Sequence, residues 1–97
     1  IKLTFYRIAQ EALNNVVKYA KARQVTLDLR MQPTGVRMVV GDDGIGFDPE
    51  AVGPTHLGVR IMRERAEAVD ARVSIISEVG HGTMVIVTWS DPESETV

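Results

Sequence analysis

The stretch of sequence that decides the fold is Val36-Arg37-Met38-Val39-Val40-Gly41-Asp42-Asp43-Gly44-Ile45-Gly46-Phe47. Its first half alternates as a β-strand does, with Val36, Met38 and Val40 on one side. Counting on by two from these apolar residues reaches Asp42, so a carboxylate lies on the face that otherwise points into the core. Val39 adds an apolar side chain on the second face, which places this strand toward the middle of a sheet.

The inward position of Asp42 has two interpretations. A carboxylate taken out of water must find hydrogen-bond donors, and the following Gly44 and Gly46 permit positive φ or close approach of a ligand to the backbone. Asp42 could therefore accept a hydrogen bond from an exocyclic amine, as on adenine, while the glycines leave room for the ring. Alternatively, Asp42 caps the turn that follows the strand, which is a common role for Asp.

The flanking sequence predicts an α/β sandwich, an α+β fold in which helices cover one face of a mixed or antiparallel sheet. Residues 1–20 have helical spacing, with Thr4 as the expected cap, and residues 25–31 alternate as a strand with one solvated face. Helical spacing returns over 57–69, and two more strands are expected at about 72–78 and 83–89. We assign four residues to packing: Phe5, Met38, Met62 and Trp89.

The 97 residues suffice for one core, so we expect a single domain over residues 1–90 and a disordered acidic tail over 91–97. A net charge of −2 excludes the broad basic field that nucleic acids or acidic membranes require. No apolar run is long enough to span a membrane and no leader precedes the first helix, so we expect a soluble chain. The absence of cysteine excludes disulfides, thiolate metal sites and cysteine nucleophiles.

The first helix has a polar strip next to its apolar face. Glu11, Asn15 and Lys18 lie four and three residues apart, so an α-helix brings them to one strip. Carboxylate and amide oxygens suit Mg²⁺ and an ammonium group suits phosphate, so the strip could hold a Mg²⁺-nucleotide. A solvated helix face with a hydrogen bond between Glu11 and Asn15 is the alternative.

A loop of about fourteen residues, 43–56, precedes the second helix, and its length suggests a mobile lid. The helix start near Leu57-Gly58 would offer free N–H groups to a phosphate, and Arg60 could add charge. The alternative is a plain surface loop with Arg60 paired to Glu64.

Gly80-His81-Gly82-Thr83 joins the last two strands and predicts a hairpin turn with positive φ. His56 and His81 each lack a second His or Cys at ligand spacing, so both are expected to be exposed loop residues and not metal ligands.

Four segments occur in the order and rough spacing of the N, G1, G2 and terminal glycine boxes of the GHKL ATPase superfamily, which the chain therefore resembles. They are Glu11-Ala12-Leu13-Asn14-Asn15-Val16-Val17-Lys18-Tyr19, Asp42-Asp43-Gly44-Ile45-Gly46-Phe47, His56-Leu57-Gly58-Val59 and Gly80-His81-Gly82-Thr83. Residues 6–12 and 62–66 look like the catalytic ATP-binding domain of bacterial sensor histidine kinases. Within these, the chain is most similar to the nitrate and desaturase-type sensors, whose response regulators carry helix-turn-helix output domains.

The resemblance implies Mg²⁺ with ATP as cofactor and a role for each matching residue. Asn15 would ligate Mg²⁺ with support from Glu11, and Asp42 would accept the adenine amine. The phosphates would contact Lys18, Leu57-Gly58 and Arg60. The adenine or ribose would be covered by Tyr19, and the base would contact Gly44, Ile45 and Gly46. The floor of the pocket would be formed by Gly82-Thr83.

The implied activity is transfer of the ATP γ-phosphoryl group to a His on a separate dimerisation domain, in a cytoplasmic part of a parent that could be membrane-anchored. No helical hairpin with a phosphoacceptor His precedes Ile1, so the chain alone should not autophosphorylate. Relatives often have Gly where Ile61 stands and His where Tyr19 stands, and many kinases outside this subfamily have a second Gly where His56 stands. These departures affect the lid and phosphate contacts. An anti-sigma-factor-type serine kinase and a non-catalytic nucleotide sensor or interaction module are the alternatives.

Overall fold

The computed structural model describes residues 1–46 and 54–91, with only the backbone of Tyr19 and of residues 54–57. The elements in chain order are α1 (Lys2–Asn15), the π-helical turn η1 (Val16–Ala20), β1 (Val25–Gln32), β2 (Gly35–Asp42), α2 (Pro54–Glu67), β3 (Arg72–Ser77) and β4 (Thr83–Ser90). Within the described ranges, no helix is long and apolar enough to cross a membrane.

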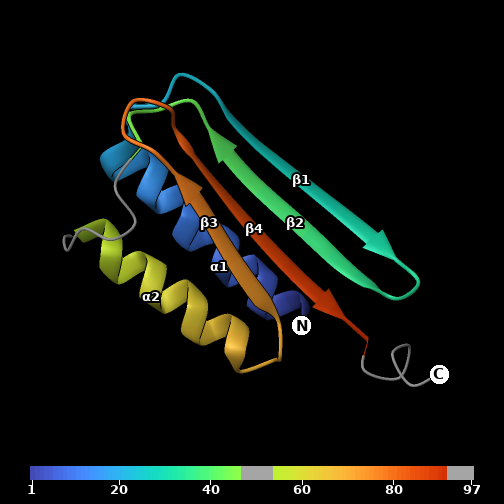
Figure 1. Cartoon of the computed structure of the whole chain (residues 1–97). Coiled ribbons are helices and arrows are strands. Elements are labelled where there is room, and N and C mark those ends of the chain that lie inside the picture. Colours follow the sequence, from blue (N-terminus) through green and yellow to red (C-terminus); the bar gives the residue numbers. More distant parts are fainter. Residues whose placement is uncertain (47–53, 92–97) are drawn as a thin grey trace.

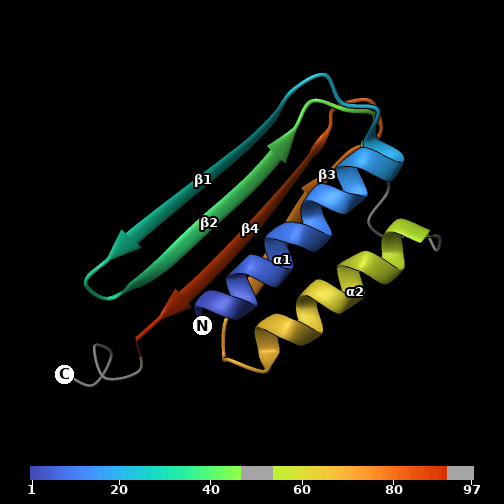
Figure 2. The ribbon, with the colours of Figure 1, turned by 180° about the vertical axis from the view of Figure 1, so that it is seen from behind.

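The four strands form one antiparallel sheet in the order β1-β2-β4-β3. Both α-helices pack on the same face of this sheet and its other face carries no helix (Figure 1, Figure 2). The predicted α+β sandwich is therefore confirmed, with an antiparallel sheet. The prediction that the strand ending in Asp42 lies inside the sheet is also confirmed, because β2 pairs with β1 on one side and β4 on the other.

The core lies between the helices and the inner face of the central strands. Val40 of β2 is opposite Val85 of β4, and Met38 is opposite Val87. All four side chains are buried, as the period of two predicts. The rest of the core comes from the helices and from the turn after α2: Phe5, Ile8, Ala12, Met62, Ala66 and Ala71, with Trp89 packed against it.

Both α-helices begin differently from the prediction. Ile1, not Thr4, stands at the N-cap of α1, and it makes no side-chain cap hydrogen bond. Helix α2 begins at Pro54, three residues before the predicted start at Leu57. Proline suits the first position of a helix because its missing N–H would be unpaired there in any case. The middle of the predicted lid, 47–53, and the tail residues 92–97 lie outside the described residues.

The β3–β4 hairpin has the positive φ angles that its glycines predict. Gly80 and Gly82 have φ of 88° and 79°. A Cβ at Gly80 would meet open space, whereas a Cβ at Gly82 would overlap the backbone carbonyl of Asp42. Gly82 thus lets the hairpin lie directly against the end of β2.

We predict different costs for alanine at these two positions. Gly80→Ala should lower the free energy of unfolding by about 1–2 kcal/mol, because alanine is strained at positive φ. Gly82→Ala should cost at least about 1 kcal/mol more, because the backbone near Asp42 must move as well. Urea unfolding of the two variants checks this, and equal losses would contradict the close packing of Gly82 on β2.

Candidate functional site

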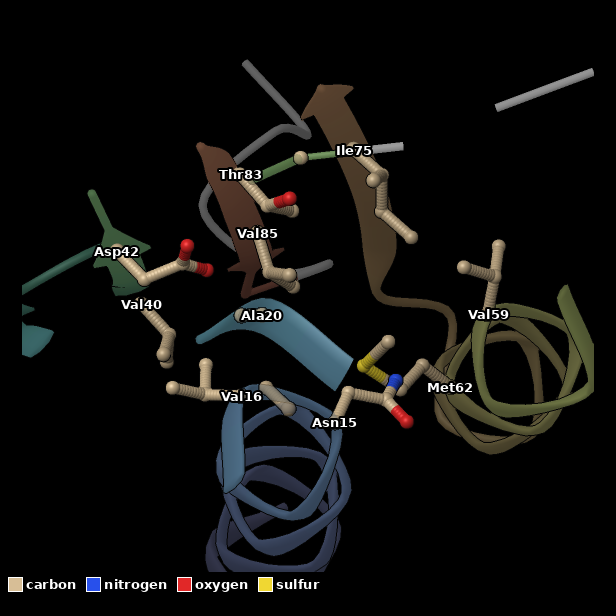
Figure 3. Close-up of a pocket in the computed structure, with 12 residues that line it drawn as sticks. Asn15, Val16, Ala20, Val40, Asp42, Val59, Met62, Ile75, Thr83 and Val85 are labelled. Atoms are coloured by element: carbon tan, nitrogen blue, oxygen red, sulfur yellow. The ribbon is translucent and has the colours of Figure 1, made fainter. Parts of the chain in front are cut away.

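A cleft lies at the end of the sheet where β2 ends and β4 begins. It lies between α1 with η1, α2 and the inner face of β2, β4 and β3 (Figure 3). Asp42 and Thr83 line it on the sheet side, and their positions are opposite each other in the register of β2 and β4. Asn15 and Met62 line it on the helix side. Val59 of α2 also lines the cleft, so the chain brings residues from all four of its predicted motifs to one place.

Asp42 points into this cleft from the last position of β2 (Figure 3). Its Oδ1 accepts a hydrogen bond of 2.8 Å from the backbone N–H of Gly44. Among the described residues, no partner binds its Oδ2. The carboxylate therefore stabilises the turn with one oxygen and offers the other to the cleft, so the two interpretations of Asp42 are compatible.

The loop after Asp42 is held between η1 and the β3–β4 hairpin. The Ile45 N–H donates to the Ala20 carbonyl over 2.7 Å, and the Gly80 N–H donates to the Ile45 carbonyl over 2.6 Å. A Cβ at Gly44 would overlap the Ala20 carbonyl, and Gly46 has φ of 65°. Both glycines are therefore required by the backbone. The Ile45 side chain is half exposed and does not line the cleft.

Thr83 is the first residue of β4 and its side chain is half-buried. Its Oγ1 lies 2.8 Å from Oγ of Ser77, which also donates to the Gly82 carbonyl over 3.2 Å. Sequence reasoning did not find Ser77, because a lone Ser at a strand end carries no motif. The Ser77 hydroxyl therefore holds the hydroxyl of Thr83, which lines the cleft together with Asp42.

Glu11 and Asn15 share one strip of α1, as the helical spacing predicts, and α2 packs directly against them. The contact is made through the buried Gly58: an added Cβ there would lie 2.6 Å from Asn15 Nδ2 and 2.9 Å from Glu11 Oε1. No hydrogen bond joins Glu11 to Asn15 in the described structure. Gly58 therefore positions two oxygen-bearing side chains at the helix junction.

Lys18 lies beyond the end of α1. The helix changes at Val16 to a π turn, which has more residues per turn than an α-helix. The Lys18 side chain is exposed, and its place on the strip with Glu11 and Asn15 stays a prediction. Arg60 is also exposed, and its Nε lies 3.5 Å from Oε1 of Glu64, as the plain pairing predicted.

Several predicted residues remain to be placed. His81 is exposed, as expected. The side chains of Tyr19, His56 and Leu57 are outside the described part of the chain. The described residues contain no group of three His, Cys, Asp or Glu that could hold a metal ion.

The cleft is narrow. Its space amounts to about 40 Å³, enough for one or two water molecules but not for a purine ring. Apolar side chains close it from the helix side, including Met62, which we had assigned to packing, and Val59. Entry of a large ligand therefore requires the side chains that close the cleft, such as Val59 and Met62, to turn aside.

Asp43, next to Asp42, has a different environment and supports the loop from outside the cleft. Its Oδ1 accepts hydrogen bonds of 2.9 Å from the backbone N–H groups of Gln24 and Arg23. The bond from Gln24 contributes most, and together these bonds lower the pKa of the exposed Asp43 carboxyl below its usual value. A lowered pKa in the folded state means that ionised Asp43 stabilises the fold.

This stabilisation is complete above about pH 4 and is lost as the pH falls through the lowered pKa. We predict that Asp43→Asn is less stable than the parent chain at pH 7, and that the difference shrinks as the pH falls below about 4. Urea midpoints at pH 7 and pH 3 measure this. If the difference in urea midpoint between the variant and the parent chain is the same at both pH values, the charge of Asp43 does not contribute to stability.

The fold and the cleft define a class of protein: a two-layer α+β domain with a helix-lined cleft that presents a carboxylate from the sheet and oxygen side chains from α1. The sequence profile of the Histidine kinase-, DNA gyrase B-, and HSP90-like ATPase family matches residues 2–93. The chain belongs to this family.

Similar proteins are sensor kinases from bacteria. The chain is 39% identical over 89 residues to the oxygen sensor histidine kinase NreB of Staphylococcus carnosus. The aligned region is 88% of this chain and 25% of NreB. It is 38% identical over 82 residues to the sensor histidine kinase LiaS of Bacillus subtilis, and this aligned region is 84% of this chain and 23% of LiaS. The chain thus spans about a quarter of the length of these relatives.

A solved structure has the same fold at low identity. The ATP-binding domain of PrrB from Mycobacterium tuberculosis superposes with a TM-score of 0.72 at 19% identity. The match covers 95% of this chain and 70% of that one.

Proposed function

We propose that this chain is the Mg²⁺-ATP-binding catalytic domain of a sensor histidine kinase, which donates the ATP γ-phosphoryl group to a His on a separate dimerisation domain of its parent protein. The observation that carries the proposal is Asp42, whose carboxylate points into the cleft with one oxygen available for a ligand. The named relatives are sensor histidine kinases. Their names do not favour the alternative functions, a serine kinase or a non-catalytic sensor.

Asp42 is proposed to select the base. Its available oxygen would accept a hydrogen bond from the adenine amine, while Gly82-Thr83 forms the polar floor beside it and Gly44 and Gly46 leave the loop backbone close to the ring. The apolar lining of the cleft supports this role, because a hydrogen bond to a charged acceptor contributes more where water is excluded.

Glu11 and Asn15 are proposed to hold Mg²⁺. The donor set fits the ion, because a carboxylate and an amide oxygen lie one helical turn apart, and Mg²⁺ takes one or two such protein ligands and keeps several waters. The ion would neutralise charge on the phosphates. The protein contributes position and electrostatic stabilisation to phosphoryl transfer.

The remaining contacts are proposed on the motif alone. Lys18, Arg60 and the backbone at Leu57-Gly58 would border the phosphates, and Tyr19 would cover the adenine or ribose. Lys18 and Arg60 are exposed, so both would need to turn toward the bound nucleotide.

The partners follow from the reaction. The phosphorylated His would pass its phosphoryl group to a response regulator, and we place the domain in the cytoplasm, where ATP is available.

Phosphotransfer in trans tests the proposal. The chain is mixed with the cognate dimerisation domain and γ-labelled ATP, and acid-labile label on that domain is measured. We expect transfer that depends on both Mg²⁺ and the acceptor His, and loss of it with Asn15→Ala. Glu67→Ala, on the exposed side of α2, is the control that should keep it. Absence of transfer where the intact parent is active would contradict the proposal.

A further inference from the structure

The hydroxyl of Thr83 lies at the cleft but is bound from outside it. Asp42 and Thr83 lie next to each other on the sheet side of the cleft (Figure 3). Ser77, on β3, is not among the described residues that line the cleft. Its Oγ lies 2.8 Å from Oγ1 of Thr83 and 3.2 Å from the carbonyl oxygen of Gly82. Ser77 can therefore influence a ligand through Thr83 without touching the ligand itself.

The hydrogens of the two hydroxyls can be assigned by counting. A serine hydroxyl has one hydrogen to donate, and a carbonyl oxygen can only accept. The hydrogen of Ser77 therefore goes to the Gly82 carbonyl. The contact between the two hydroxyls must then use the hydrogen of Thr83, which Thr83 donates to Ser77. Toward the cleft, the Thr83 oxygen presents lone pairs and no hydrogen, so it is a hydrogen-bond acceptor there.

Asp42 and Thr83 together present two acceptors at a definite spacing. The two residues are directly opposite each other in the register of β2 and β4, where side chains on one face have Cβ atoms about 4.5–5.5 Å apart. A planar amine directs its two hydrogens about 120° apart, so hydrogen bonds of about 2.9 Å along these directions reach acceptors about 5 Å apart. The spacing of the pair thus matches one amine that donates both of its hydrogens.

We propose that Ser77 is a positioning residue for base selection: by accepting the hydrogen of Thr83, it makes Asp42 and Thr83 accept both hydrogens of the purine amine. The inference rests on the proposed binding of ATP in this cleft. A base with a carbonyl in place of the amine would face two acceptors. Without the Ser77 hydroxyl, Thr83 can turn its hydrogen toward the cleft and donate it to that carbonyl.

The preference for ATP over ITP tests the role of Ser77, because ITP carries a carbonyl where ATP carries the amine. Calorimetry in the presence of Mg²⁺ gives the two affinities. We expect Ser77→Ala to reduce the ratio of ATP affinity to ITP affinity by about fivefold or more. Ser74→Ala is the matched control, because Ser74 is exposed on the other face of the same strand, and it should keep the ratio of the parent chain.

The same measurement in a Thr83→Val background shows whether Ser77 acts through Thr83. Valine has nearly the shape of threonine but no hydroxyl, so Ser77→Ala should no longer change the ratio of the two affinities. A change in the ratio that persists without the Thr83 hydroxyl would overturn the proposal. So would a Ser77→Ala chain that loses affinity for ATP and ITP in equal proportion, which is the result expected if Ser77 only supports the hairpin.

The parent chain supplies a measurement that does not depend on the folding of a variant. ATP methylated once on the amine keeps one amine hydrogen, so it should bind about fivefold more weakly than ATP or worse. Equal binding of the two nucleotides would overturn the proposal. A chain that binds ATP but fails these tests leaves the proposed function standing, whereas a chain that binds neither ATP nor ITP contradicts the proposed function and this inference with it.

Discussion

Asp42→Asn is expected to weaken the binding of ATP by roughly 5- to 150-fold, which corresponds to about 1–3 kcal/mol. The amide oxygen of Asn can still accept the N–H of Gly44, as Oδ1 of Asp42 does over 2.8 Å. The amide NH₂ then replaces the available oxygen and points into the cleft. Two donors, the amide and the adenine amine, would face each other, so the variant loses an attraction and gains a repulsion. Calorimetry with Mg²⁺-ATP measures the loss.

The neighbouring residue supplies the control for this variant. Asp43→Asn removes the same charge one residue away, but the carboxylate of Asp43 binds the backbone of Arg23 and Gln24 and not the cleft. It should bind ATP as the parent chain does, at a pH where both are folded. The parent chain should also prefer ATP to GTP, because guanine presents a carbonyl where adenine presents its amine, and Asp42→Asn should reduce this preference. Unchanged ATP affinity in Asp42→Asn would mean that Asp42 serves only the turn.

Gly58→Ala is expected to lower the affinity for Mg²⁺-ATP by more than tenfold while the fold keeps its stability. Alanine favours an α-helix over glycine by up to about 1 kcal/mol, so α2 itself gains. The new Cβ, however, would lie 2.6 Å from Asn15 Nδ2 and 2.9 Å from Glu11 Oε1, closer than unbonded atoms approach. Both side chains must turn away, and these are the two proposed Mg²⁺ ligands.

Thermal unfolding and calorimetry with Mg²⁺-ATP together test Gly58→Ala. Gly41→Ala is the matched control, because it adds the same methyl group on the outer face of β2, where its nearest neighbour is Thr26 Oγ1 at 3.3 Å. We expect this control to bind ATP normally. A Gly58→Ala chain with unchanged affinity would show that Glu11 and Asn15 need not occupy their present positions. A chain that loses stability in parallel with affinity would point to a packing role for Gly58 instead.

The part of the site that the sequence could predict is the part set by periodicity. A period of two placed Asp42 on the inner face of β2, and helical spacing placed Glu11 and Asn15 on one strip of α1. The hairpin glycines indicated positive φ because few other residues adopt it, and Gly80 and Gly82 do.

Other features could not be predicted from the sequence, for identifiable reasons. The π turn at Val16–Ala20 is a property of the backbone that no side-chain pattern in these residues predicts. The anchor of the loop at the Ala20 carbonyl likewise involves a main-chain atom, which every residue possesses. The narrowness of the cleft depends on how closely α2 approaches α1, and a periodic pattern assigns faces to residues but not distances between elements.

A crystal structure of the chain with Mg²⁺ and a non-hydrolysable ATP analogue tests the central claim most directly. The account predicts the side chains of Val59 and Met62 turned aside, the adenine amine within hydrogen-bond distance of the second carboxylate oxygen of Asp42, and the metal ion beside Asn15. A nucleotide bound elsewhere, or an Asp42 carboxylate turned toward solvent with the analogue present, would contradict it.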